Sequence, residues 1–134
     1  MKRGLTLGGL TVAVLWALSA GGYGEPREEL RDFMRAKLRH SQKVLEGLVL
    51  EDFDMIAKSA QEMSLLSLAE TWQVLNTPDY IEYSRKFRNA ADSLADAAKK
   101  KKLDQATLAA NQVTVKCVEC HKYVRGVRMA EASK

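Results

Sequence analysis

Glycine and proline are nearly absent from the long central part of this chain of 134 residues. Between Gly24 and Gly126 the only glycine is Gly47, and the two prolines are Pro26 and Pro78. Strand signals are missing as well, because apolar and polar residues do not alternate for long and no Asn-Gly or Asp-Gly turn occurs. With so few breakers and apolar residues at helical spacing, the chain is predicted to be all-α.

The apolar spacing divides the chain into four helical segments, and Thr77-Pro78 is the clearest boundary, with Thr77 as N-cap. The expected helices run from Pro26 to 48–51, from 51 or 52 to Leu75, from Pro78 into the lysine run 99–102, and from Asp104, as cap, to about Arg128. Helices of roughly 20–25 residues with short connections predict an antiparallel up-down-up-down four-helix bundle.

The only two cysteines of the chain lie in Cys117-Val118-Glu119-Cys120-His121, which has the C-x-x-C-H spacing of covalent haem attachment. Two thiols three residues apart share one face of a helical turn, where they can add to the two vinyl groups of one porphyrin. His121 follows directly and can ligate the iron as proximal ligand. The motif therefore predicts one haem c, attached through Cys117 and Cys120 to the C-terminal helix of the bundle.

Zinc binding and thiol redox chemistry are the alternatives for this motif. A structural zinc site needs four ligands, and the only other histidine, His40, lies far upstream. A redox dithiol of the thioredoxin type requires a strand–helix context, which the sequence does not contain. Haem attachment is the favoured interpretation.

The N-terminus has the pattern of an export signal. The cationic Met1-Lys2-Arg3 precedes an apolar run over 5–20 and small residues up to Gly24. This pattern predicts a secretory signal peptide at residues 1–24 and one domain at residues 25–134, with an uncleaved anchor as the alternative. Covalent haem attachment takes place outside the cytoplasm, so signal and motif together predict a periplasmic protein with no membrane attachment after cleavage.

The charge of the chain gives no case for nucleic acid as a partner. The formal net charge is +4, and removal of Lys2 and Arg3 with the signal lowers it to +2. Two haem propionates would bring the total near zero, so the basic character of the mature protein is small.

The placement of the motif near the end of the last of four helices resembles the cytochrome c′ and cytochrome c556 family, the four-helix-bundle c-type cytochromes. The resemblance spans about residues 26–128. It is strongest at the motif and at Arg125, where family members commonly carry a basic residue, and Tyr123 lies one place from the family's usual aromatic. The stretch Lys37-Leu38-Arg39-His40-Ser41 is similar to the family's K-x-R-x-S stretch.

The resemblance implies that the first helix covers the distal side of the haem. Family members with Met opposite the proximal His are low-spin electron carriers, and members with Leu or an aromatic residue there are five-coordinate and bind NO or CO. The family's distal position lies four residues after the Arg of the first helix, where this chain has Lys43.

Chain geometry indicates another distal residue. His121 lies about eight residues before the expected end of the last helix, so the iron level falls about eight to twelve residues after Pro26 on an antiparallel first helix. That window runs from Met34 to Leu38, and Met34 is the leading candidate for the sixth ligand. Core packing is the alternative role for a methionine on an apolar stripe.

Other residues remain candidates for the distal position. His40 is one, and Lys43 is another if burial in an apolar pocket removes its proton. Without a sixth ligand the iron would be five-coordinate, with Leu38 or Leu45 capping an apolar pocket.

Several further side chains are candidates for contact with the haem. Arg39 or Arg125 could pair with a propionate, because a guanidinium matches a carboxylate bidentately, although each could equally be a solvated surface residue. Trp72, Phe87 and Tyr123 could pack on the ring, although aromatic residues in a bundle core need no haem.

Two functions follow from these observations. The first is electron transfer with redox partner proteins, and the alternative is binding of NO or CO at a five-coordinate iron. An enzyme such as a peroxidase would need a distal acid–base group over the iron, and nothing places His40 there, so the chain is not predicted to be an enzyme. A non-haem helical metal or interaction module is disfavoured by the export signal together with the motif, and a homodimer is left open.

Overall fold

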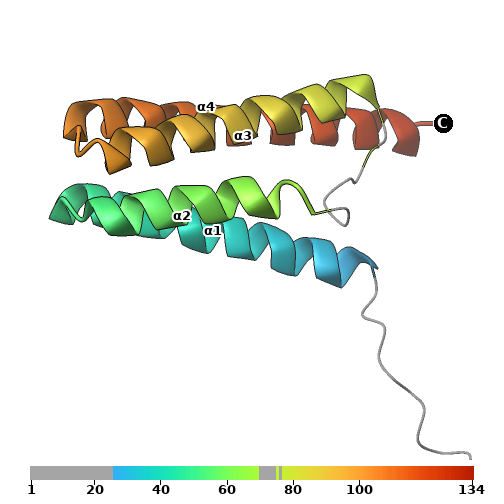
Figure 1. Ribbon diagram of the computed structural model, residues 1–134. Coiled ribbons are helices and arrows are strands. Elements are labelled where there is room, and N and C mark those ends of the chain that lie inside the picture. The colour runs from blue at the N-terminus through green and yellow to red at the C-terminus, as the bar shows by residue number, and fades with distance from the viewer. Residues whose placement is uncertain (1–25, 70–74, 76) are drawn as a thin grey trace, which may run out of the picture.

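The computed structural model describes residues 26–69, 75 and 77–134, and this part of the chain contains helices and turns without a strand. The helices are α1 (Pro26–Leu50), α2 (Phe53–Leu66), α3 (Pro78–Lys99) and α4 (Leu103–Ala132) (Figure 1). The predicted all-α class is confirmed, and the arrangement is compatible with a four-helix bundle. The predicted signal peptide and Trp72 lie outside the described residues. No helix in the described part is long and apolar enough to cross a membrane.

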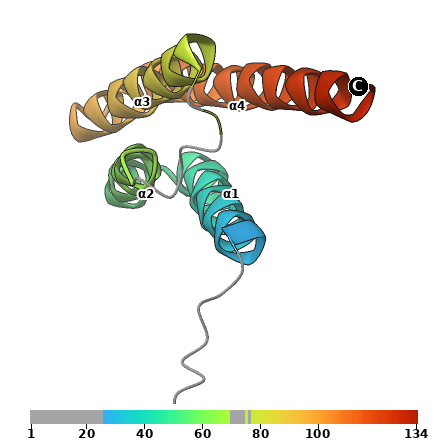
Figure 2. The ribbon, with the colours of Figure 1, turned by 90° about the vertical axis from the view of Figure 1, so that its right-hand side faces the viewer.

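The helices lie in two layers, with α1 beside α2 and α3 beside α4 (Figure 1), as the turned view also shows (Figure 2). α2 packs against both α1 and α3, and α3 packs along α4, whereas α1 and α4 touch only sparsely. The α1–α2 turn and the α3–α4 turn lie at the same end of the molecule (Figure 1). The edge between α1 and α4 is therefore the least tightly packed edge of the arrangement.

The two short turns share one backbone motif, in which a residue of positive φ follows the helix. After α1 this residue is Glu51, with φ 55°, and the next N–H, of Asp52, donates to a carbonyl of α1 at 2.8 Å. After α3 it is Lys101, with φ 53°, and the Lys102 N–H donates to a carbonyl of α3 at 3.1 Å. These are the six-to-one bonds of the Schellman motif, which satisfy carbonyl groups that a helix end leaves free.

Gly47 allows α1 and α2 to approach closely next to their turn. A Cβ atom at this position would lie 2.8 Å from Cγ1 of Ile56 and 3.1 Å from the carbonyl oxygen of Asp52. Ile56 is fully buried, so its side chain has little freedom to move aside. The one glycine in the central part of the sequence thus marks a tight helix–helix contact.

The predicted start of α3 is confirmed by its cap, and α2 begins at Phe53, just after the predicted 51 or 52, with Asp52 as its N-cap. The Thr77 hydroxyl accepts a hydrogen bond from the Tyr80 N–H at 3.2 Å, and Pro78 is the first helical residue. The Asp52 carboxylate accepts from the Met55 N–H at 2.9 Å. Each cap pairs one of the N–H groups that the first turn of a helix leaves without a partner.

The predicted end of α2 is wrong, because the helix stops at Leu66 and Leu75 is not helical. The next residue, Ser67, donates its hydroxyl to the Met63 carbonyl at 3.0 Å and accepts from Nζ of Lys37 at 2.8 Å. A contact from α1 therefore holds the end of α2. Such a tertiary contact leaves no local mark in the sequence.

The predicted ends of α4 are also displaced. The helix begins at Leu103 and ends at Ala132, and Lys102 holds the N-cap position without a side-chain cap bond. Asp104 lies in the first turn instead of at the cap. Its carboxylate is still favourable there, because it faces the positive end of the helix dipole. The Schellman turn before α4 decides where the helix begins.

The hydrophobic core lies mainly between α2, α3 and α4, and α1 contributes only Val44 to its buried members among the described residues. Small side chains let these helices approach, and the larger ones fill the space between them. The fully buried members are Ile56, Ala60, Ala91, Leu94, Ala98 and Ala106. Most of the inner face of α1 therefore takes no part in this core.

We expect Lys101→Gly to stabilise the protein. A non-glycine residue in the left-handed region costs about 1–2 kcal/mol, and glycine adopts this conformation without that cost. Equilibrium unfolding in denaturant should show an increase in the free energy of unfolding of about 1 kcal/mol. The matched control is Lys99→Gly, inside the last turn of α3, which should lower the stability by about 1 kcal/mol. A loss of stability in both variants would contradict the turn assignment.

Candidate functional site

The C-x-x-C-H motif lies in the middle of α4, and its three chemical side chains open on one cavity. Cys117 is half-buried, Cys120 is 7% exposed and His121 is largely exposed, and all three line a cavity of about 450 Å³. Neither thiol is in a disulfide. A helical backbone places residues i, i+3 and i+4 on one face, so the sequence spacing itself brings the three groups together.

The cavity lies between α1 and α4, at the edge where the two helices touch only sparsely. Its floor is formed by Met63 of α2 and by Ser84 and Phe87 of α3, all of which are buried. The wall opposite the motif is the inner face of α1, and the lining is predominantly apolar. The volume falls in the range of sites for small molecules and cofactors, about 300–1,000 Å³.

The same hollow continues along the α1–α4 edge towards the short turns. A second cavity of about 480 Å³ follows the first, and Ser41, Met63 and Thr114 line both. The two cavities together form a groove along the inner face of α1.

Lys37 of α1 is the most unusual side chain of the cavity, because it is a lysine that is only 9% exposed. Its Nζ donates to the Ser67 hydroxyl at 2.8 Å and lies 3.5 Å from the centre of the Phe87 ring. The first contact ties α1 to the end of α2, and the second places the amine over the ring face from α3. Lysine is rarely buried to this extent.

The pKa values of the site show how burial and Lys37 act on it. Burial, opposed by Cys117 and Cys120 and aided by Arg88, lowers the pKa of Lys37 from 10.5 to about 7. Burial raises the pKa of both thiols, and the charge of Lys37 opposes that rise. Desolvation, Arg125 and Lys37 lower the pKa of His121. A neutral imidazole, which is the form that ligates iron, is favoured at neutral pH.

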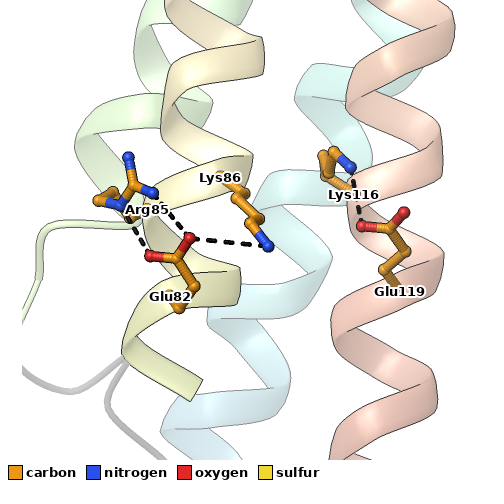
Figure 3. Close-up of polar contacts among 5 residues, drawn as sticks. All are labelled: Glu82, Arg85, Lys86, Lys116 and Glu119. Carbon is orange, nitrogen blue, oxygen red and sulfur yellow. Dashed lines mark hydrogen bonds and ion pairs between the residues drawn. The ribbon is translucent and has the colours of Figure 1, made fainter. Parts of the chain in front are cut away.

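The charge of a second lysine that lines the cavity is balanced by a glutamate of the same helix. Lys116 precedes the motif and forms an ion pair with Glu119 at 2.9 Å (Figure 3). On α3, Glu82 accepts from Arg85 at 2.7 Å and lies 3.6 Å from Lys86 (Figure 3). The Arg85 hydrogen bond lowers the pKa of the Glu82 carboxyl. The pairs on α3 are exposed, and exposed pairs contribute little to stability.

The structure brings together some of the predicted site residues. Met34, Leu38 and Phe87 line the cavity with the motif. Lys43 and Leu45 are exposed and lie outside this lining, although Leu45 borders the second hollow.

His40, the other histidine, is not in the lining of either cavity. It is half-buried, and its Nδ1 atom has no hydrogen-bond partner in the described part of the chain. Burial, Lys43 and Arg39 lower the pKa of His40, and Glu62 opposes them.

The arginines and the tyrosine that the sequence offered as haem contacts lie elsewhere. Arg39 and Arg125 are exposed and do not line the cavity. The Tyr123 hydroxyl shares a hydrogen bond of 2.8 Å with the hydroxyl of Thr77, and its ring centre lies 5.1 Å from that of Tyr83. Tyr123 therefore ties α4 to the start of α3.

Sequence reasoning gave no role at the site to several side chains that line the cavity, among them one buried lysine, two arginines and a methionine. These residues are Arg31, Arg35, Lys37 and Met63. A signal for the buried lysine was present, because Met34, Lys37, Leu38 and Ser41 have the i, i+3, i+4, i+7 spacing of one helix face. A lysine within an apolar stripe on the inner face of a helix is the pattern that identifies it.

The chemistry of the cavity fits a covalently bound haem. Both thiols and the imidazole open on one apolar space of suitable size, and Arg31 and Arg35 lie at the same cavity as exposed cations that could pair with propionates. No three His, Cys, Asp or Glu side chains in the described ranges are placed to hold a metal ion together.

Comparisons with known proteins add no assignment: no protein family, no curated protein and no solved structure matches this chain.

We expect Lys37→Met to stabilise the chain produced without haem. Between about pH 7 and pH 10.5 the unfolded chain binds more protons at Lys37 than the folded chain, so the free energy of unfolding of the unsubstituted protein rises with pH in this window. Below the window, removal of the buried charge should stabilise the chain by on the order of 1–4 kcal/mol. The gain should shrink as the pH rises.

Denaturant unfolding at several pH values measures this effect. The Ser67 hydroxyl keeps its bond to the Met63 carbonyl in the variant. Lys43→Met, at an exposed position of the same helix, is the control and should show no such pH dependence. A loss of stability in Lys37→Met that is equal at all pH values would contradict the burial of the amine.

Proposed function

We propose that this protein is an exported monohaem c-type cytochrome that transfers electrons. Haem c is bound through Cys117 and Cys120, with His121 as proximal iron ligand, in an antiparallel up-down-up-down bundle of the cytochrome c′ and c556 type. The observation that carries the proposal is the opening of both thiols and the imidazole on one apolar cavity. The export signal expected at residues 1–24 supports a periplasmic location.

The residues of the cavity have distinct roles in this proposal. The bound haem supplies a one-electron iron couple. Phe87 and Met63 form an apolar floor that keeps water away from the ring, which is one of the means by which a protein sets a reduction potential. Arg31 and Arg35 of α1 are one helical turn apart and are better placed for the propionates than the predicted Arg39 and Arg125.

The position opposite His121 decides between electron transfer and gas binding. A strong-field ligand from α1 keeps the iron low-spin in both redox states, and Met34, which lines the cavity, is the candidate from chain geometry. The alternative function, binding of NO or CO at five-coordinate iron, is favoured by the apolar Leu38 in the same wall. The partners are redox proteins in the first case and small gaseous ligands in the second.

Covalent attachment is the first test of the proposal. The protein is produced in a periplasm with haem-attachment machinery, and haem is detected on the denatured chain. We expect one covalent haem in the unsubstituted protein and none in the double variant Cys117→Ser/Cys120→Ser. The control is Val118→Ala, inside the motif at an exposed side chain, which should keep its haem. A chain that matures without covalent haem would contradict the proposal.

The absorption spectrum of the loaded protein separates the two functions. A low-spin spectrum in both redox states that carbon monoxide does not alter is expected for the electron carrier. A high-spin spectrum that shifts on addition of carbon monoxide would instead assign the protein to gas binding.

A further inference from the structure

Lys37 lines the cavity that the proposed haem would fill. It is carried by α1, on the wall that faces the motif, and its Nζ atom contacts Ser67 at the end of α2 and the floor residue Phe87. Its charge acts on the pKa of each chemical side chain of the motif, Cys117, Cys120 and His121. A porphyrin attached at both thiols therefore comes close to this amine.

A buried lysine is costly unless it has a specific role. Lys37 is only 9% exposed, and this burial disfavours its ammonium form and lowers its pKa. A methionine of similar length would fill the same apolar space without that cost. Groups that lower stability and lie in a cavity beside reactive residues are candidates for function.

We propose that Lys37 is the distal ligand of this haem, with its Nζ atom at the iron position opposite His121; this inference rests on the proposed cytochrome function. The ammonium gives up one proton to solvent, and the freed lone pair of Nζ forms the bond to iron. No oxidation or reduction accompanies this step. Burial already favours the neutral amine that such a bond requires.

Lys37 is better placed for this role than Met34. Met34 is half-buried and lies three residues earlier, about 4.5 Å closer to the start of α1. Lys37 is the more deeply buried of the two and contacts the floor residue Phe87. Methionine on an inner helix face needs only packing to explain it, whereas packing alone gives no reason for a lysine there.

The test compares lysine-to-alanine variants on one helix in the covalently loaded protein. Lys37→Ala removes the proposed ligand, and Lys43→Ala changes an exposed lysine of α1 outside the cavity. The readouts are the spin state of the oxidised iron and the affinity of the reduced iron for carbon monoxide. We expect Lys37→Ala to become high-spin and to bind carbon monoxide about tenfold more tightly or better, because the sixth position no longer has a competitor. Lys43→Ala should behave as the unsubstituted protein.

Chemical rescue separates ligation from a structural role. Methylamine, a small primary amine, added to Lys37→Ala should restore the low-spin spectrum, which a variant that is merely misfolded would not do. If Lys37→Ala loses its fold, Lys37→Arg provides a second variant, because a guanidinium keeps the charge and does not lose its proton to become a ligand. That variant should also be high-spin.

Three results would overturn the proposal. One is a low-spin spectrum that survives in Lys37→Ala without added amine. Another is conversion of Met34→Ala to high spin, which would assign the position to sulfur. The third is an unsubstituted protein that is already high-spin and five-coordinate. Failure of the cytochrome proposal itself is distinguishable, because the unsubstituted protein would then carry no covalent haem at all.

Discussion

The separation of α1 from α4 is the constraint on which the rest of this structure depends. Two short Schellman turns pair α1 with α2 and α3 with α4, and the packing of α2 on α3 joins the pairs. The fourth edge receives no comparable packing, because the core lies among α2, α3 and α4. The inner face of α1 therefore borders a groove, and the helix that carries the motif forms its other side.

Lys37 connects this open edge to the core. Its bond to Ser67 holds the end of α2, and its contact with Phe87 reaches α3, so one side chain of α1 contacts residues of both. The contact has a cost, because burial of an ammonium opposes folding. The chain thus carries a buried amine beside the motif, and a buried titratable group in a cavity is typical of functional sites.

Local chemistry explains which features the sequence predicts well. The all-α class follows from the scarcity of breakers, and the caps at Asp52 and Thr77 follow from residue types that bond their own helix starts. The end of α2 and the place of Lys37 could not be predicted in the same way, because both depend on a contact between residues 30 positions apart. A lysine on a helix usually lies at the surface. The spacing of Lys37 from Met34 and Leu38 is the feature of the sequence that indicates its burial.

The cavity also sets the reactivity of the two thiols before any haem is attached. Burial raises the pKa of Cys117 and Cys120, which lowers the fraction of thiolate and with it the tendency to oxidise or exchange. The charge of Lys37 opposes this effect within the same cavity. The apolar surroundings therefore protect the thiols from oxidation and exchange. The ammonium of Lys37 limits the loss of thiolate that burial causes. Lys37 of α1 thus acts on both thiols of α4 from the opposite wall of the cavity.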